Sequence, residues 1–354
     1  MFQPPFCPHR RCSQHLDPQP RFFHRHGTYH PRCRPHPVPR FRCRSCRRTF
    51  SRQTFRADYY DKRPDLNEKL FDKLTSGSGL RDAGRKLALS KRCTELKYRK
   101  IARHLRRLNL NLRRPLEGVV QLQFDELETF ETNRSLRPVT FPVLLERTTR
   151  YLIWGEAAPI RPKGKMTKAR RARIAREIRR HGRRGNGSVR ACRRTLQRGV
   201  DVVAPTASVI LQTDEKRTYP ILARRAFGPE RLEHQTTNSK VARATWNQLF
   251  PVNHEDTRMR CTMGRLRRES WLVTKRRRYL DLAFHMNAAY RNLVRTRYND
   301  DKESPAQMLG FVHRRLTHWE VLGWAQVWGK RSIHPASPRR RSVEAYEASA
   351  KSAA

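Results

Sequence analysis

The fold is decided by two short stretches, VVQLQFDE at residues 119–126 and VILQTDE at residues 209–215. Each is a mostly apolar run with the length of a β-strand, and each leads into an aspartate followed by a glutamate. If the two strands are neighbours in one sheet, Asp125 and Asp214 lie at the same end of it. We therefore predict a carboxylate site that binds a divalent cation. Taken singly, either aspartate could also be an ordinary turn residue at a strand end.

The surroundings of this site are strongly basic. The 354 residues include 78 Lys and Arg against 31 Asp and Glu, a formal net charge of +47, and 37% of them are hydrophobic. This hydrophobic fraction supports a folded core, whereas the charge opposes a compact state unless a polyanion neutralises it. Nucleic acid is the first candidate polyanion, and an anionic membrane surface is the second. The absence of a run of about 18 apolar residues argues against a membrane-spanning protein.

Residues 1–62 carry four cysteines in metal-ligand spacing. Cys7 and Cys12 form one close pair, and Cys43 and Cys46 form the second. This pattern predicts a zinc ribbon, in which thiolate ligation of a structural Zn²⁺ takes the place of a large core. Cys33 or a nearby histidine could supply one of the ligands, and scattered free thiols are the alternative. Metal ligation in place of disulfides favours a reducing, intracellular setting.

Residues 63–112 have the spacing of three helices. Leucines recur at positions 66, 70 and 74, a Ser-Gly-Ser-Gly break follows, and a short helical segment covers 80–87. Ser90 is a suitable N-cap for a long basic helix that ends near Leu108. This order predicts an all-α helix-turn-helix domain that binds the major groove of DNA. The DNA-contacting residues would be Lys91, Arg92, Lys97, Arg99 and Arg103. A solvated basic helix that packs on its neighbours is the alternative.

Residues 113–300 have the mixed pattern of an α/β domain. Strand-like runs lie at 119–124, 139–146, 151–154, 200–203 and 209–213, and helical spacing begins at Tyr219 and returns between 256 and 298. A basic insertion at 161–198 holds sixteen Lys or Arg and one acid, Glu177, and should include an exposed basic helix over 167–180. Residues 301–354 are expected to form a C-terminal helical segment and a basic, disordered tail.

Three tracts together resemble the DDE transposases of bacterial insertion sequences, in particular the insertion-sequence-one-like group. The ribbon ending FRCRSCRRTFS at 41–51, followed by a helix-turn-helix, resembles the front end of these proteins. FDE at 124–126 and TDEK at 213–216 are similar to the first two acids of their DDE domain. RLRRESW at 265–271, with Thr274 and Lys275 after it, is similar to an arginine-rich helix near the end of that domain.

This resemblance implies a transposase with a ribonuclease H-like catalytic domain behind its zinc ribbon and helix-turn-helix. Such an enzyme cuts the ends of its element and joins their 3′-hydroxyls to target DNA, with Mg²⁺ or Mn²⁺ held by carboxylates. The partners would be double-stranded DNA of the terminal repeats and of the target, no membrane, and further copies of the chain in a homo-oligomer. Arg265 and Arg268 would also contact DNA. The setting would be the bacterial cytoplasm, in association with the nucleoid.

The third acid of the motif is the point at which this chain departs from the pattern. The simplest register puts Asn253 where the family has a glutamate. Helical spacing places Glu255 above Met259 and Met263, so we predict Glu255 as the third metal ligand, with Asp256 close behind and Glu269 as a more distant choice. Glu255 could equally be an acid that favours the start of a helix.

Other functions remain open on the sequence alone. A non-catalytic zinc-ribbon DNA-binding regulator, or an inactive transposase relic, would keep the basic N-terminal half without a working acid site. A structural RNA-binding protein would also suit the charge, although the aromatic residues form no obvious base-stacking platform.

Overall fold

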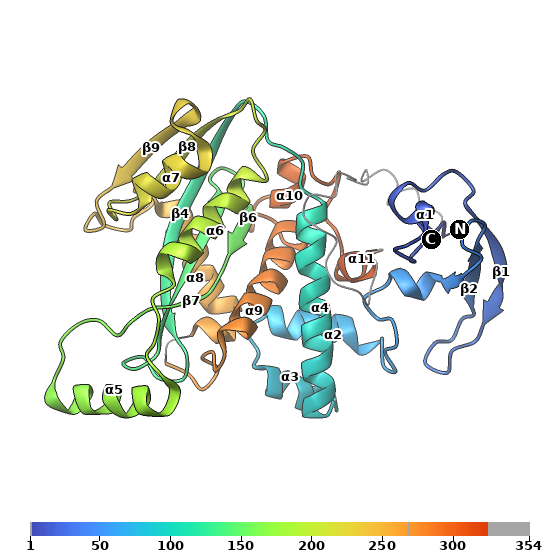
Figure 1. Ribbon diagram of the computed structural model, residues 1–354, viewed down its shortest axis with the longest axis horizontal. Helices are drawn as coiled ribbons and strands as arrows, with labels where there is room; N and C mark the ends of the chain where they lie inside the picture. Colours follow the sequence, from blue (N-terminus) through green and yellow to red (C-terminus); the bar gives the residue numbers. More distant parts are fainter. Residues whose placement is uncertain (1, 268, 325–354) are drawn as a thin grey trace.

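The computed structural model describes residues 2–267 and 269–324. This part of the chain has mixed α/β content, with a small cysteine cluster near the N-terminus and a mixed sheet in the middle (Figure 1). These features are compatible with the multidomain layout expected from the sequence. The tail expected to be disordered, residues 335–354, lies outside the described residues, as do all residues from 325 onward.

A three-stranded antiparallel sheet forms most of the N-terminal module. Its elements are α1 (Ser13–Leu16), β1 (Phe23–Tyr29), β2 (Val38–Cys43), β3 (Thr49–Ser51) and the short 3₁₀ helix η1 (Arg52–Phe55). Its small core consists of phenylalanines and buried cysteines: Phe6, Phe22, Phe41, Phe50, Phe55, Cys7, Cys12 and Cys43. A core of this size leaves much of the module's stability to other links.

Three helices follow where the spacing predicted them: α2 (Leu66–Thr75), α3 (Leu80–Lys86) and α4 (Lys91–Asn111). The predicted N-cap is confirmed, because Ser90 Oγ accepts a hydrogen bond of 3.2 Å from the backbone N–H of Cys93. Gly84 allows α3 to approach α4 closely, since a Cβ at this position would lie 2.5 Å from Thr94 Oγ1.

The central sheet has the strand order β6-β5-β4-β8-β9, with β7 paired to β5. The strands are β4 (Val119–Phe130), β5 (Pro138–Glu146), β6 (Leu152–Gly155), β7 (Ala158–Pro159), β8 (Ser208–Asp214) and β9 (Leu232–Thr237). The middle strand, β4, is antiparallel to β5 and parallel to β8, and β9 is parallel to β8. Parallel neighbours need crossover connections, and these contain α6 (Ser188–Val200) and α7 (Tyr219–Phe227).

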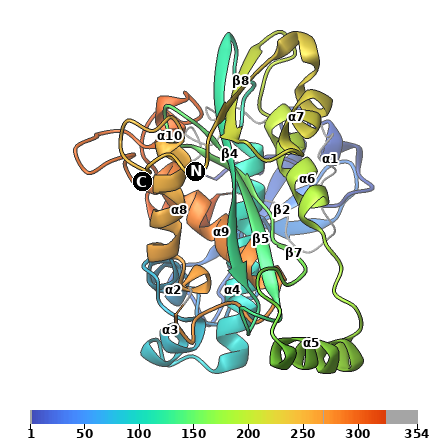
Figure 2. The ribbon, with the colours of Figure 1, turned by 90° about the vertical axis from the view of Figure 1, so that its left-hand side faces the viewer.

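Helices cover both faces of this sheet (Figure 2). The helices α6 and α7 pack on one face, and α8 (Phe250–Thr262) and α9 (Arg277–Ala289) pack on the other. Two short helices, α10 (Pro305–Met308) and α11 (His318–Gly323), come last in the described chain. One cluster of buried side chains includes residues of α4, the sheet, α9 and α11. Buried residues on both sides of the expected domain boundary at residue 112 therefore belong to the same cluster.

Two sequence predictions of local structure are wrong. Residues 200–203 form no strand, because Val200 is the last residue of α6 and Val203 makes a lone bridge to Leu116. The arginine-rich tract forms no α-helix over its described residues: Gly264–Leu266 is a short 3₁₀ helix, η3, and Arg268 lies outside the described residues. In both places the local pattern was compatible with more than one structure, and packing against distant segments decided between them.

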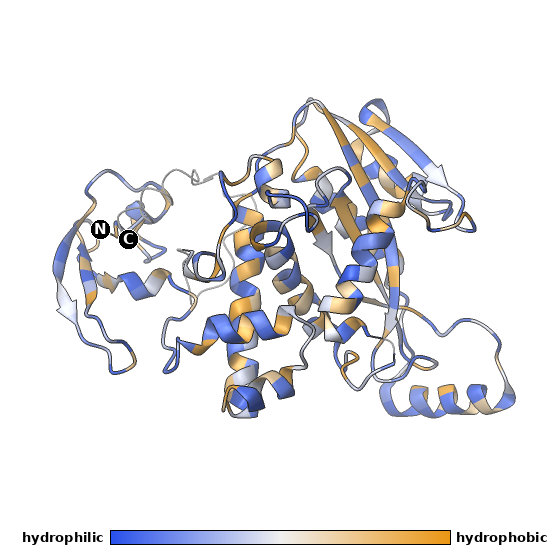
Figure 3. Ribbon diagram, turned by 180° about the vertical axis from the view of Figure 1, so that it is seen from behind, coloured by the Kyte–Doolittle hydropathy of each residue, from blue (hydrophilic) through white to orange (hydrophobic). Residues whose placement is uncertain are grey.

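The exposed basic helix predicted in the insertion is α5 (Lys168–His181). None of its residues is buried, and it stands apart from the sheet at the end of two connecting segments. Hydrophobic residues concentrate on the strands and the helices around them, whereas α5 is mostly hydrophilic (Figure 3). Within the described residues, no helix combines the length and the apolar character that crossing a bilayer requires.

Candidate functional site

The four predicted cysteines come together in the N-terminal module. The Sγ atoms of Cys7, Cys12, Cys43 and Cys46 all lie within 4.8 Å of one another, and three of the four residues are buried. Cys7 Sγ is 3.6 Å from Cys46 Sγ, and Cys12 Sγ is 3.7 Å from Cys43 Sγ. Cys33 is outside this group, and all eight cysteines are free of disulfides. The group could bind a structural metal such as zinc.

The register of the sheet places Asp125 beside Asp214. Strands β4 and β8 run parallel, with Val119 paired to Ser208 and Gln123 paired to Gln212. The same offset sets Asp125 level with Asp214, which is the last residue of β8. Asp125 is not at a strand end as the sequence suggested, because β4 continues to Phe130. It therefore lies in the middle of the central strand, where it is half-buried.

A ladder of glutamines crosses the three central strands one step before these acids. Gln123 Nε2 donates to Gln212 Oε1 at 2.8 Å, and Gln212 Nε2 donates to Gln235 Oε1 at 2.9 Å. Gln123 also bonds the segment that leads into α8, donating to the carbonyl of Gln248 at 2.6 Å and accepting from the N–H of Val252 at 2.9 Å. The ladder therefore fixes both the register of β4, β8 and β9 and the position of the first turn of α8.

This placement brings Asp256, on α8, near Asp125. Asp125, Asp214 and Asp256 are called the acid group below. Asp256 Oδ1 is buried and has no hydrogen-bond partner among the described residues. Burial raises the pKa of Asp256 well above its ordinary value, and the neighbouring charge of Asp125 raises it further. An orphaned, buried carboxylate oxygen next to a second carboxylate is the arrangement that a bound cation would relieve.

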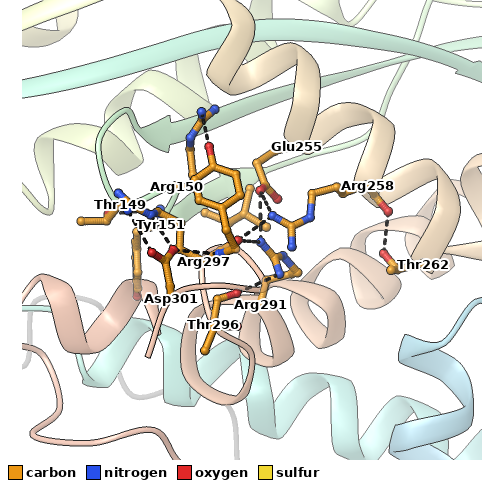
Figure 4. Close-up of polar contacts among 12 residues, drawn as sticks. Thr149, Arg150, Tyr151, Glu255, Arg258, Thr262, Arg291, Thr296, Arg297 and Asp301 are labelled. Atoms are coloured by element: carbon orange, nitrogen blue, oxygen red, sulfur yellow. Dashed lines mark hydrogen bonds and ion pairs between the residues drawn. The ribbon is translucent and has the colours of Figure 1, made fainter. Parts of the chain in front are cut away.

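Glu255, the predicted third ligand, instead lies beside Arg258 and Arg291 (Figure 4). It is fully buried, and its Oε1 accepts from Arg258 Nη1 at 3.0 Å and from Arg291 Nη2 at 3.1 Å. Arg291 is itself 3% exposed, so the two form a buried ion pair. The apolar stripe on which the sequence prediction relied does face the interior, but there Glu255 balances two arginines rather than joining Asp125 and Asp214.

Burial is the main cause of the raised pKa of Asp125, as it is for Asp256. Burial raises the pKa of Asp125 to about 6, with a further contribution from the charge of Asp214. Arg243 acts in the opposite direction on both Asp125 and Asp256, and Arg260 does so on Asp256. Arg243 was not singled out in the sequence, because nothing local marks an arginine in the loop between β9 and α8 as a neighbour of these acids.

Glu126, adjacent to Asp125, points to the opposite face of the sheet and belongs to a separate polar cluster. Its carboxylate is bonded by Lys216 Nζ, by Ser188 Oγ at 2.7 Å, by Thr140 Oγ1 at 2.8 Å and by Tyr219 OH at 3.0 Å. Burial opposes its ionisation, but these bonds prevail and lower the pKa of Glu126 to about 2. Glu126 therefore links β4 to α6 and α7, and it has no free oxygen for the acid group.

Some of the predicted DNA-contacting side chains are exposed, and others are in contact with groups of the protein itself. Lys91, Arg92 and Arg103 are exposed, and Arg99 is half-buried. Lys97 is 4% exposed and is held by Asp61 Oδ2, the Arg63 carbonyl and Asn67 Oδ1, so it is placed as an internal support of α4. Arg265 lies over the rings of Tyr98 and Tyr279, at 5.6 and 5.2 Å from their centroids. Arg268 lies outside the described residues.

The acid group is less tightly gathered than the cysteine group. Among residues 2–267 and 269–324, the four cysteines form the one group of three or more potential ligands whose donor atoms are close enough together to hold a metal ion. The carboxylate oxygens of Asp125, Asp214 and Asp256 are farther apart than this. Comparison with known proteins adds no assignment, since neither a protein-family model nor a curated protein matches the chain.

Proposed function

We propose that the chain is a DNA transposase that performs metal-dependent strand cleavage and strand transfer. The observation that carries this proposal is the group Asp125, Asp214 and Asp256, three acids from β4, β8 and α8 on one face of the sheet of a chain with net charge +47. The charge of Asp214 raises the pKa of Asp125, and the charge of Asp125 raises the pKa of Asp256, so a bound cation would relieve the repulsion among these acids.

The residues present suit Mg²⁺ or Mn²⁺. All three are hard oxygen donors, and the orphaned Oδ1 of Asp256 is free to bind. Bound ions would activate a water or a 3′-hydroxyl and stabilise the leaving oxygen of a phosphodiester. The protein's own part is to hold the carboxylates through the glutamine ladder and to present Arg243, whose charge acts on Asp125 and Asp256, to a phosphate of the substrate.

The fold supports the same assignment. A mixed sheet, with its acids on the central strand and its parallel neighbour and with helices on both faces, is consistent with a ribonuclease H-like domain. The four-cysteine module and the helices α2–α4 would serve as zinc ribbon and helix-turn-helix, with Lys91, Arg92 and Arg103 against DNA. Bringing two element ends together would require more than one copy of the chain.

Cleavage and joining of DNA that carries the sequences flanking the gene tests the proposal. Wild type should cut with Mg²⁺ or Mn²⁺ and not when both ions are left out, and Asp125→Asn, Asp214→Asn and Asp256→Asn should bind DNA but fail to cut. Glu233→Gln is the matched control, because it removes an exposed carboxylate from β9 of the same sheet, and it should cut like wild type. Binding without cleavage by wild type in both metals would instead identify a DNA-binding regulator or an inactive relic.

A further inference from the structure

The helix α5 presents one face to the body of the protein without packing on it. Ile174, Glu177, Ile178 and His181 recur at helical spacing, so they form a single stripe along α5. This stripe, together with Leu136, Arg137, Pro159 and neighbouring residues, lines a hollow of about 390 Å³ between α5 and the body. Ile178 is 40% exposed, so part of its apolar surface is open to an occupant of the hollow.

Polar contacts near its two ends hold α5 over this hollow. Arg170 donates to the carbonyls of Ser135 at 3.2 Å and Lys163 at 2.8 Å, near the start of the helix. Beyond its end, Arg184 donates to the Pro138 carbonyl at 2.8 Å and pairs with Glu131 at 3.0 Å. The middle of the helix is linked by one ion pair, between Glu177 and Arg137. These contacts hold α5 in place on one side of the hollow, opposite the body of the protein.

The lining of the hollow combines apolar surface with positive charge. Its apolar residues are Leu136, Pro159, Pro162, Met166, Ile174 and Ile178, and five arginines surround them. Arg137, Arg184 and Arg277 are engaged by Glu177 and Glu131. Arg161 and Arg183 are exposed and have no ion-pair partner among the described residues. An occupant must therefore offer both an apolar face and a negative charge.

We propose that this hollow binds an unpaired nucleotide of a DNA strand, with its base against the apolar lining and its phosphate beside Arg161 and Arg183. The volume is within the range of small-ligand sites. The outer surface of α5 carries exposed arginines at 171, 173, 176, 179 and 180, which would contact the phosphates that continue the same strand. This continuity favours nucleic acid over a free nucleotide.

The apolar lining is what distinguishes an unpaired nucleotide from duplex DNA. In a duplex the flat faces of the bases are stacked on one another, so a duplex would engage only the arginines. An unpaired base can turn its face to apolar side chains. This inference rests on the DNA-binding part of the proposed function but not on cleavage.

The test compares two labelled DNA duplexes in buffer without added Mg²⁺ or Mn²⁺, one blunt and one with a three-nucleotide single-stranded extension. Wild type should bind the extended DNA about fivefold tighter or more, and 2-aminopurine in the extension should change its fluorescence on binding. The double variant Ile174→Gln, Ile178→Gln keeps the charges of α5 but removes its apolar stripe. It should bind the two DNAs with equal affinity, and its affinity for the blunt duplex should be within about twofold of that of wild type.

Ile221→Gln is the matched control, because Ile221 is an isoleucine of α7 that is 56% exposed and lies outside the lining of the hollow. It should keep the preference for the extended DNA, and circular dichroism should show all variants folded. Equal binding of the two DNAs by wild type, or an unchanged preference in the double variant, overturns the inference while leaving the proposed function standing. Loss of cleavage with the preference intact would contradict only the proposed function, and failure to bind either DNA would contradict both.

Discussion

Two neighbouring acids on α8 give opposite predictions for stability. Each has one buried carboxylate oxygen without a hydrogen-bond partner, but Glu255 forms ion pairs with Arg258 and Arg291, whereas Asp256 has no ion-pair partner among the described residues. Asp256→Asn should therefore raise the unfolding free energy in EDTA at pH 7.5 by about 1 kcal/mol or more, because it removes an uncompensated charge. Glu255→Gln should lower it by about 1 to 3 kcal/mol, because two cations lose their counter-ion. Thermal and urea unfolding of both variants measure this, and stabilisation by Glu255→Gln would contradict the placement.

The pKa of Asp125 makes the stability of the metal-free protein depend on pH. Its pKa rises from 3.8 to about 6 on folding, so the folded state holds this proton more tightly than the unfolded state. Stability should fall as pH rises from about 4 to about 6, and Asp125→Asn should remove part of that slope. Metal affinity should change in the opposite direction, since Mn²⁺ competes with the proton. Unfolding in EDTA and Mn²⁺ titration, both from pH 4.5 to 7.5, test the two slopes, and an unchanged slope in Asp125→Asn would count against the raised pKa.

At the scale of single elements, the glutamine ladder should matter more than its side chains suggest. Gln212→Leu leaves Gln123 Nε2 and Gln235 Oε1 each short of a partner within the sheet. The expected cost is about 1 to 3 kcal/mol of unfolding free energy. Mn²⁺ binding should also weaken, because the hydrogen bonds that position the acids on β4, β8 and α8 relative to one another are lost. Gln19→Leu, which removes an exposed glutamine in the N-terminal module, is the control and should change neither quantity. Mn²⁺ affinity unaltered by Gln212→Leu would show that the ladder only supports folding.

The N-terminal module should depend on its metal, because its core is small. Chelation, or Cys43→Ser, is expected to expose residues 1–62 to protease while the rest of the chain resists cleavage. The helices of the body do not share that core, so their circular dichroism should persist. Elemental analysis should find one zinc per chain in wild type and none in Cys43→Ser. Protection of the module after complete zinc removal would show that the phenylalanine core alone is sufficient.

Sequence predictions succeeded where the deciding interactions join residues close together in sequence, and they failed where those residues are far apart. Local spacing located α2, α3, α4 and α5, the Ser90 cap and the cysteine pairs, because caps, helical stripes and ligand spacing act within a few residues. The same reasoning chose Glu255 over Asp256. The spacing showed which face of α8 is buried, but it could not show that Arg291 lies on that face and forms an ion pair with Glu255. Lys97 was assigned to DNA for a similar reason, since its partner Asp61 lies 36 residues away in sequence.

At the scale of the whole molecule, the helices that resemble a separate DNA-binding domain are part of the central core. Ile101, Leu105 and Leu108 of α4 are buried in the cluster that also holds the sheet, and Tyr98 OH donates to the carbonyl of Tyr279 in α9 at 2.6 Å. At its other end the chain returns to α4, where Val321 of α11 accepts a bond from His104 Nε2 at 2.7 Å.

A fragment of residues 63–112 should therefore be largely unfolded, because its buried stripe would face water without α9 and α11. In the full chain, α4 should unfold in the same transition as the sheet, which circular dichroism and hydrogen exchange of the α4 amides can compare. Leu105→Ala, in the middle of the stripe, should lower the midpoint of both signals together by removing about 2 to 5 kcal/mol of stability. Leu96→Ala is the matched control, because Leu96 is 54% exposed on the same helix and should change neither signal. Cooperative folding of the isolated fragment would instead support the boundary at residue 112 and show that residues 63–112 fold as an independent domain.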